Sequence, residues 1–428
     1  MNTYSAYKDS GEQWLGQIPE HWEIGRLANY FTERREKVSD KEFAPLSVTK
    51  NGVLPQLENV AKSNDSENRK GVRKGDFVIN SRSDRKGSSG VSDRDGSVSL
   101  INIVLTPRKS INTAYCNYLL KSQNFIEEFY RYGRGIVADL WTTRYSEMKL
   151  MKLAIPPLDE QEAMVAYLDE QTAQIDSAIA REQKMIDLLN ERKQIIIQHA
   201  VTKGLNPNAK MKDSGIEWIG EIPEEWEVMR LKRLVDFAGR IGFRGYGTED
   251  LTDEENGAIT LSPSNMQNGK MTYIKCAYLK WHKYYESPEI MVYDGDILFV
   301  KTGSTYGKTA IVKDLPKEAT INPQLLILKN IKGDNRFIAH MLSTPLIKNQ
   351  VERIVIGGTI PTISQEKIGN LRLIVPNKDE QISIVEYIAE KTKPIDDAIK
   401  AKDKLISLLQ ERKQIIINEV VTGKIKVS

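Results

Sequence analysis

A glycine-rich segment in the second half of the chain has residue types that could bind phosphate. In Gly303-Ser-Thr-Tyr-Gly-Lys308-Thr309 two glycines precede a Lys-Thr pair, as in the loops whose backbone N–H groups hold a nucleotide. The spacing is one residue too short, because position 302 is Thr rather than Gly. The residues that follow, Ala310-Ile-Val-Lys-Asp314, have the pattern of a strand, whereas a phosphate-binding loop leads into a helix. The segment therefore predicts a polar loop that faces a binding partner, not an ATP site.

Other residue sets with catalytic chemistry are incomplete. Asn322-Pro-Gln324 lacks the Pro-aromatic ending with which adenine N6-methyltransferases hold a flipped base, and it lies in a strand-like run. No GxGxxG follows a strand, and no nucleophile elbow or HExxH occurs. Two cysteines lie far apart and four histidines lack the spacing of metal ligands: Cys116, Cys276, His21, His199, His282 and His340. We expect no catalytic residues and no metal, so the protein should work by binding.

Polar side chains that can bond to base edges and phosphates gather in Gly- and Ser-rich loops. In the first half of the chain the candidate DNA-binding residues are Arg82, Arg85, Lys86, Tyr132, Arg134, Thr143 and Arg144. In the second half they are Arg240, Arg244, Tyr246, Lys301, Ser304, Thr305, Tyr306 and Lys308. The formal net charge is only +3, but residues 20–155 hold 23 Lys and Arg against 17 Asp and Glu, and residues 224–375 hold 20 against 18. This excess is weak support for contact with phosphates, since scattered surface charge would also produce it.

Two internal repeats supply the frame that positions these loops. Residues 156–202 recur as 376–422 with 25 identities over 47 positions, including Glu191–Ile197 and Glu411–Ile417, which are both ERKQIII. Residues 7–27 recur as 211–231 with 13 identities over 21 positions. The offset is 220 in the first case and 204 in the second, so the second copy has gained 16 residues, which we place between Leu231 and Asp294. The segments between the repeats differ almost completely.

The repeat at 156–202 has the pattern of a long helix. Its apolar residues recur at helical spacing, and Gly204 and Gly423 mark the two ends. Each helix should run for roughly 30 residues, or about 45 Å. The helices either pack on each other as an antiparallel coiled coil, which the matched sequences favour, or lie separately on their own domains. The predicted helix–helix seam consists of Ile175, Ile179, Ile186, Leu189, Ile196, Ile395, Ile399, Ile406, Leu409 and Ile416.

The variable segments have the patterns of mixed α/β domains. Strands are expected at DFVINS, SVSLINIVL, ILFVKT and INPQLLILKN, and short helices at residues 112–132 and 334–353. The fold class is therefore α+β, with two mixed α/β domains, two long helices and an internal pseudo-twofold repeat. The expected boundaries are 1–155 for a first domain that includes the segment 7–27, 156–210 for a helical spacer, 211–375 for a second domain and 376–428 for a second spacer.

The whole chain resembles the specificity subunits of type I restriction–modification systems. The order KDSGEQWLGQIPEHWE, variable segment, IPPLDEQ-helix-ERKQIII-AVTKGL, then the same again, is specific to that family. The resemblance implies two target recognition domains, near residues 26–154 and 230–374, each of which reads one half of a split DNA target. It also implies that the helical regions 155–204 and 375–423 act as a molecular ruler and bind the partner subunits.

The same resemblance implies the partners and cofactors. Two modification subunits would bind S-adenosylmethionine and methylate adenine N6, and two restriction subunits would use ATP with Mg, so that this chain holds no cofactor itself. Since the two interiors differ, the DNA target should be asymmetric. The alternatives are a scaffold that binds only proteins and a DNA-modifying enzyme that acts alone. A cytoplasmic location is expected, because the sequence contains no run of 18 apolar residues and does not begin with a signal pattern.

Overall fold

The structure, a computed structural model, describes residues 3–56, 67–135, 141–240, 245–267, 269–355 and 361–427. The chain forms two compact units. Unit 1 contains residues 1–184 and 402–428, and unit 2 contains residues 185–401. Each unit groups one variable segment with parts of both long helices, whereas the sequence suggests separate spacers at 156–210 and 376–428.

The repeated segments 7–27 and 211–231 form the same small frame in both units. Each begins with a two-stranded antiparallel hairpin: β1 (Tyr7–Asp9) with β2 (Gln17–Pro19), and β14 (Met211–Asp213) with β15 (Glu221–Pro223). The next strand pairs with the strand that leads into a long helix: β3 (Glu23–Arg26) with β13 (Lys152–Ile155), and β16 (Glu227–Arg230) with β27 (Arg372–Val375). This pairing brings both ends of each variable segment together on a shared frame.

The variable segment of unit 1 combines small sheets with short helices. A four-stranded sheet has the order β10 (Ser89–Val91), β9 (Phe77–Asn80), β12 (Asn102–Pro107), β4 (Phe31–Glu33). A three-stranded sheet has the order β11 (Gly96–Val98), β8 (Arg69–Val72), β5 (Lys37–Val38), and β6 (Leu46–Thr49) pairs with β7 (Gly52–Pro55). The helices are α1 (Leu27–Tyr30), α2 (Thr113–Lys121), α3 (Gln123–Arg131) and α4 (Tyr145–Met148). The strand expected at SVSLINIVL is therefore divided between β11 and β12.

Unit 2 has a larger sheet. Its six strands have the order β17 (Asp236–Gly239), β26 (Leu325–Lys329), β23 (Ile297–Val300), β24 (Thr309–Ile311), β21 (Lys270–Met271), β20 (Met266–Gln267). A second sheet has the order β18 (Leu251–Thr252), β22 (Ala277–Lys280), β19 (Gly257–Leu261), β25 (Ala319–Ile321). The helices are α6 (Trp281–Tyr285), α7 (Asn335–Leu342), α8 (Pro345–Ile354) and α9 (Gln365–Gly369). Asn322-Pro-Gln324 forms the turn between β25 and β26, so the expectation of one continuous strand there is wrong.

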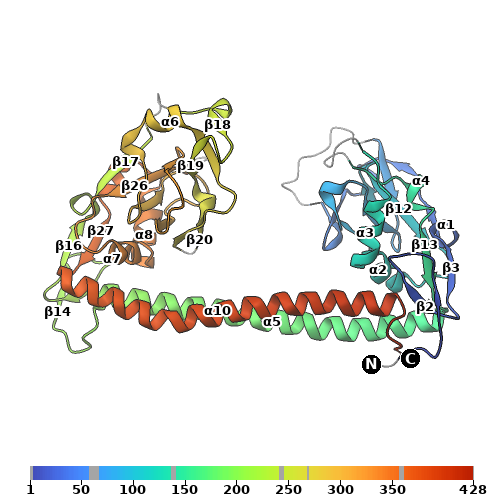
Figure 1. The fold of residues 1–428 in the computed structure, drawn as a ribbon. Coiled ribbons are helices and arrows are strands. Elements are labelled where there is room, and N and C mark those ends of the chain that lie inside the picture. Colours follow the sequence, from blue (N-terminus) through green and yellow to red (C-terminus); the bar gives the residue numbers. More distant parts are fainter. Residues whose placement is uncertain are drawn as a thin grey trace. The chain divides into compact units, whose positions relative to one another are not determined.

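The long helices α5 (Leu158–Lys203) and α10 (Lys378–Val421) contain 46 and 44 residues, against the roughly 30 expected. They run side by side and antiparallel (Figure 1). In unit 1, Asp176 of α5 bonds to Lys413 of α10, and in unit 2, Lys193 of α5 bonds to Asp396 of α10. The expected coiled coil is confirmed. The glycines expected at the helix ends, Gly204 and Gly423, have φ of 78° and 72°, in the left-handed region that ends helices.

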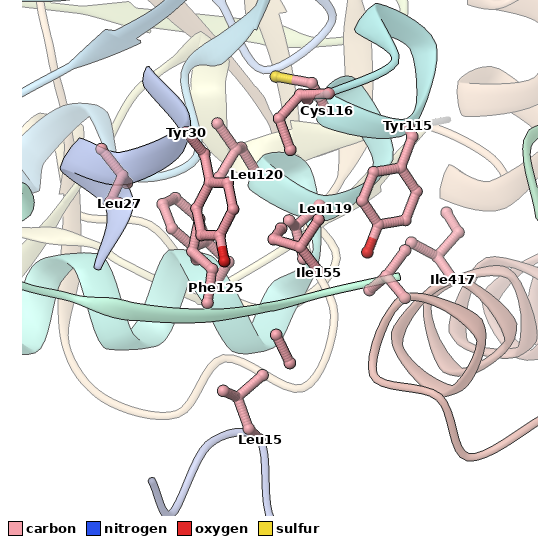
Figure 2. Close-up of a cluster of buried hydrophobic side chains, with 14 of the residues drawn as sticks. Leu15, Leu27, Tyr30, Tyr115, Cys116, Leu119, Leu120, Phe125, Ile155 and Ile417 are labelled. Carbon is pink, nitrogen blue, oxygen red and sulfur yellow. The ribbon is translucent and has the colours of Figure 1, made fainter. Parts of the chain in front are cut away.

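The core of each unit includes the long helices. In unit 1, Met164 and Leu168 of α5 and Val420 and Val421 of α10 are buried with the residues of α2, α3 and β13. Figure 2 shows part of this core, with Tyr115 and Leu119 of α2, Ile155 of β13 and Ile417 of α10. In unit 2 the corresponding core holds Ile197, Ala200 and Val201 of α5 with Ile384, Val385 and Ile388 of α10. Each variable segment is thus packed firmly on its own part of the helix pair.

Candidate DNA-binding loops

In unit 1, backbone hydrogen bonds join two loops that carry most of the predicted DNA-binding residues. The first loop, residues 81–88, connects β9 to β10, and the second follows α3 and reaches α4 at residue 144. Ser83 N donates to Trp141 O at 3.0 Å, and Thr143 N donates to Ser81 O at 3.0 Å. Arg134 and Thr142 exchange two further backbone bonds of 3.0 Å. A short ladder therefore holds these two loops side by side.

Unit 2 builds the same ladder from different residues. Gly303 N donates to Pro361 O at 3.0 Å, and Ile363 N donates to Lys301 O at 2.9 Å. Thr302 and Thr362 form a bridge, as Arg82 and Thr142 do in unit 1. Each of these positions lies 220 residues after its counterpart. Within the variable segments the same backbone hydrogen bonds therefore recur at the offset of 220, although the side chains differ.

The paired loops of unit 1 present several guanidinium groups. Arg82, Arg85, Arg134 and Arg144 are exposed. Lys86 is half-buried and bonds to Glu127 at 2.5 Å, and its ammonium lies 5.9 Å from the centre of the Tyr130 ring. Tyr132 is half-buried, with the Arg131 guanidinium 5.2 Å from its ring centre. An exposed guanidinium can bond to a phosphate or bind a guanine edge through two parallel hydrogen bonds.

Thr143 has a different position from the exposed residues of these loops. It is fully buried, and its hydroxyl donates to Phe129 O at 2.9 Å. Its counterpart in unit 2 is Ile363, which is also buried. The Thr143 side chain thus anchors the second loop in the core and does not face solvent.

In unit 2 the paired loops present mainly hydroxyl groups. Ser304 and Thr305 are exposed, and Lys301, Tyr306 and Lys308 are half-buried. Burial lowers the pKa of Lys301. The segment 303–309 leads into the strand β24, as the sequence predicts, and no helix follows it.

The remaining candidates of unit 2 lie after β17. Arg240 is buried, and its guanidinium donates to Ile321 O at 3.1 Å and to Thr320 Oγ1 at 3.2 Å. It also lies 5.0 Å from the centre of the Tyr246 ring, and burial lowers its pKa. Arg240 therefore joins β17 to β25 and does not face solvent. Tyr246 is half-buried, and Arg244 lies outside the described residues.

The ladder adds three exposed residues that the sequence reasoning missed. Trp141 is 36% exposed and donates its indole N–H to Tyr130 O at 2.8 Å. Thr362 and Ser364 are exposed beside the loop 301–308. The offset of 220 could have found Ser364, because it relates Ser364 to the predicted residue Arg144.

The shared Asp-Glu-Gln motif at the start of each long helix fixes the frame and the helix relative to each other. Trp22 donates its indole N–H to Glu160 Oε2 at 3.1 Å, and Trp226 donates to Glu380 Oε2 at 2.9 Å. In unit 1, Tyr4 and His21 also bond to Glu160.

The glutamine of the same motif bonds to the N-terminus of a helix in the variable segment. Gln161 Oε1 accepts from Asn112 N at 2.8 Å, and Gln381 Oε1 accepts from Asp334 N at 2.8 Å. Asn112 and Asp334 are the N-caps of α2 and α7. The motif therefore ties the first turn of each long helix to the variable segment of the same unit.

The predicted seam faces inward throughout. All ten of its residues are buried or half-buried, and the buried ones are Ile175, Ile186, Ile395 and Ile416. Within the described ranges, no group of three His, Cys, Asp or Glu side chains could hold a metal ion. In the same part of the chain no helix is long and apolar enough to cross a membrane.

Comparison with known proteins agrees with this geometry. The family model described as "Type I restriction modification DNA specificity domain" matches residues 223–408. The type I restriction enzyme MjaVIII specificity subunit of Methanocaldococcus jannaschii is 29% identical over 282 residues, which span 65% of this chain and 63% of that protein. The putative type I restriction enzyme MjaX specificity subunit of the same organism is 26% identical over 96% of both chains.

A solved structure shares the fold. A chain from a type I R-M system, described in terms of complex assembly and conformational transition, superposes with a TM-score of 0.62 at 15% identity, covering 95% of this chain and 99% of that one. These similarities lead to one conclusion: residues 223–408 match the type I restriction modification DNA specificity domain, and the chain is similar over 96% of its length to a putative type I restriction enzyme specificity subunit.

Proposed function

We propose that each unit reads one half of an asymmetric, two-part target in double-stranded DNA through its paired loops. By this reading the chain directs adenine-N6 methylation and restriction by partner subunits. The observation that carries the proposal is the repeated ladder, which holds the loops alike in both units while presenting different exposed side chains. Equal backbones with unequal side chains are suited to recognising two unlike half-sites.

The exposed groups support this division. Unit 1 offers Arg82, Arg134 and Arg144, whose guanidinium groups pair with phosphate or guanine, and each two-bond contact with a base gives about 1–3 kcal/mol of discrimination. Unit 2 offers hydroxyl groups on Ser304, Thr305, Thr362 and Ser364, which can donate to or accept from a base edge.

The experiment that tests the proposal is methylome sequencing of a cell that expresses this chain with modification subunits. We expect one motif with two unlike halves and a fixed gap. Replacing Ser304 and Thr305 together by alanine should weaken or relax one half only. Arg82→Ala with Arg134→Ala should affect the other half only. A variant of either unit that altered both halves would contradict independent reading.

The outer faces of the long helices support binding of the modification subunits. In unit 1, Leu405, Leu408 and Ile415 of α10 are 42%, 51% and 47% exposed. Their repeat equivalents in unit 2, Met185, Leu188 and Ile195 of α5, are 44%, 49% and 59% exposed. Grouped exposed apolar side chains are typical of protein interfaces. Two equivalent surfaces suit two modification subunits, and two restriction subunits would join the same complex.

Native mass spectrometry of the complex tests this stoichiometry. Leu408→Lys should remove one modification subunit, and the double variant Leu188→Lys with Leu408→Lys should remove both. A complex that keeps both subunits in the double variant would refute the proposed surface.

We also propose that S-adenosylmethionine, and ATP with Mg, are bound by the partner subunits and that the chain itself is not catalytic. In support, Gly303–Thr309 leads into a strand and Asn322-Pro-Gln324 lies in a turn, so neither segment has the form of a nucleotide or base pocket. Purified chain incubated with DNA and labelled S-adenosylmethionine should transfer no methyl group. Turnover by the chain alone would overturn this part of the proposal.

The helix pair is proposed to set the gap between the half-sites. Inserting one heptad after each of the equivalent residues Lys184 and Lys404 preserves the seam and lengthens both helices by about 10 Å. The gap in the methylated motif should grow by about three base pairs at 3.4 Å each, with both half-sites unchanged. An unchanged gap would refute the ruler.

A further inference from the structure

Among the described residues, three ion pairs join α5 to α10. In unit 1, Asp176 pairs with Lys413 at 2.7 Å and Glu182 pairs with Lys402 at 2.6 Å. In unit 2, Lys193 pairs with Asp396 at 2.5 Å. The Glu182 and Lys402 side chains are only 25% and 27% exposed, so water screens this pair less than it would a fully exposed one.

The repeat distinguishes one of these pairs from the other two. Asp176 and Asp396 are equivalent at the offset of 220, and so are Lys193 and Lys413. These two Asp–Lys pairs are therefore one interaction that occurs twice. Glu182 and Lys402 are also separated by 220, so that pair joins a position to its own repeat equivalent. In an antiparallel pair of repeats, such a position marks the middle of the pairing.

The seam and the two Asp–Lys pairs do not distinguish one repeat from the other. The five seam residues of α5 and the five of α10 are identical in type at equivalent positions. An α5 helix that paired with a second α5 would keep the seam and both Asp–Lys contacts. At the middle, however, Glu182 would face a second Glu182, and two α10 helices would bring Lys402 to Lys402. Among the described ion pairs between the helices, this one alone changes from attraction to repulsion.

We propose that the Glu182–Lys402 pair determines which helices pair with each other. It makes the two repeats of the chain associate with each other and rejects a second copy of the same repeat. The partner that fits each repeat is a homologous repeat whose middle residue has the opposite charge. Charge pairs flanking a coiled-coil seam select partners in this way, through repulsion in the wrong pairing as well as attraction in the right one.

The test uses the whole chain, cut once after folding. A protease site placed between Asn206 and Pro207, in an exposed linker, divides the purified protein into an N-terminal and a C-terminal half that both remain present. The cut protein is unfolded in urea and refolded, and native mass spectrometry counts the three possible pairings. We expect the ratio of mixed to like pairs to exceed its statistical value by roughly tenfold, the factor that corresponds to 1.4 kcal/mol.

Charge variants separate the proposed pair from the rest of the interface. Glu182→Lys alone and Lys402→Glu alone make the middle contact repulsive in every pairing, so the halves should assort statistically. The double variant Glu182→Lys with Lys402→Glu should restore the preference. Lys413→Gln is the matched control. It removes one Asp–Lys contact from each mixed pair, both contacts from a pair of C-terminal halves and neither from a pair of N-terminal halves. The loss is therefore the same for two mixed pairs as for the two like pairs that they would exchange into. Statistical assortment in the parent protein, or an undiminished preference in Glu182→Lys, would overturn the proposal.

A second measurement on the uncut chain keeps the proposal decidable if the halves fail to refold. The two single variants should lower the midpoint of thermal unfolding, and the double variant should recover most of the loss. If the effects of the two single variants simply add, the residues are not coupled and the proposal fails.

Discussion

Replacing Tyr115 by phenylalanine should stabilise unit 1. Tyr115 on α2 is fully buried, and its hydroxyl has no hydrogen-bond partner among the described residues. It packs near Leu119, Ile155 and Ile417 in an apolar core (Figure 2). Burial raises the pKa of this hydroxyl, so it stays neutral and remains an uncharged polar group without compensation.

The magnitude follows from the cost of burying a hydroxyl without a partner. Such a group lowers the free energy of unfolding by about 1–3 kcal/mol. Removing the oxygen also removes a few dispersion contacts, each of about 0.1–0.2 kcal/mol. We therefore expect Tyr115→Phe to raise the free energy of unfolding of unit 1 by about 1–2 kcal/mol. For a unit of about 210 residues this corresponds to roughly 2–4 °C in melting temperature per kcal/mol.

The repeat supplies the reverse substitution as a control. Asn112 and Asp334 cap α2 and α7 in the same way, which makes Phe337 the counterpart of Tyr115. Phe337 is also fully buried. Phe337→Tyr places a hydroxyl in an apolar core that has not been shaped for it, and it should destabilise unit 2.

Hydrogen exchange measured by mass spectrometry suits this test, because peptides from α2 and α7 report on each unit of the intact chain separately. Protection should rise in α2 for Tyr115→Phe and fall in α7 for Phe337→Tyr. Unchanged or lower protection of α2 would mean that the Tyr115 hydroxyl is hydrogen-bonded, for example by a trapped water, and would refute the reasoning.

Three further predictions rest on single features. Thr143→Val should lower the stability of unit 1 by about 1 kcal/mol, because the hydroxyl bonded to Phe129 O is lost, yet leave the methylated motif unchanged; a changed motif would mean that Thr143 contacts DNA. Burial lowers the pKa of His340 to about 4, so unit 2 should be fully stabilised above about pH 6.5 and lose stability as the pH falls toward 4. Hydrogen exchange of α7 should show this loss. His340→Tyr, which introduces the residue type that Tyr118 has at the equivalent position of α2, should remove the loss. Residue 428 can be joined to residue 1 through a short linker, and the chain opened between Asn206 and Pro207. Both termini belong to unit 1, so the new linker would connect a long helix to a frame in unit 1 as residues 204–211 do in unit 2, and the protein should fold and give the same motif. An unfolded product by circular dichroism would show that the two links are not equivalent.

The sequence was most informative where the two copies agree. The repeated frame segments, the helix-ending glycines and the seam could all be predicted, because apolar periodicity and repetition depend on local spacing. The burial of Thr143 and Arg240 could not, because it depends on which distant backbone atoms they meet: Phe129 O in one case and Ile321 O in the other. The sequence pattern does not distinguish a polar loop residue that faces solvent from one whose buried side chain holds the loop in place.

The underestimated helix length has a physical reason of the same kind. The seam pattern covers only residues 175–196 of α5 and 395–416 of α10, where apolar residues recur at a regular spacing. Toward the start of α5, Met164 and Leu168 pack into the core of unit 1, and toward the start of α10, Ile384 and Ile388 pack into the core of unit 2. Since those turns face a domain as well as a helix, their apolar residues depart from the seam spacing although the backbone stays helical. The same turns carry Glu160 and Gln161, or Glu380 and Gln381, whose bonds tie each variable segment to its helix. The residues that lengthen the helices beyond the seam are therefore the ones that fix each frame and variable segment to the helices.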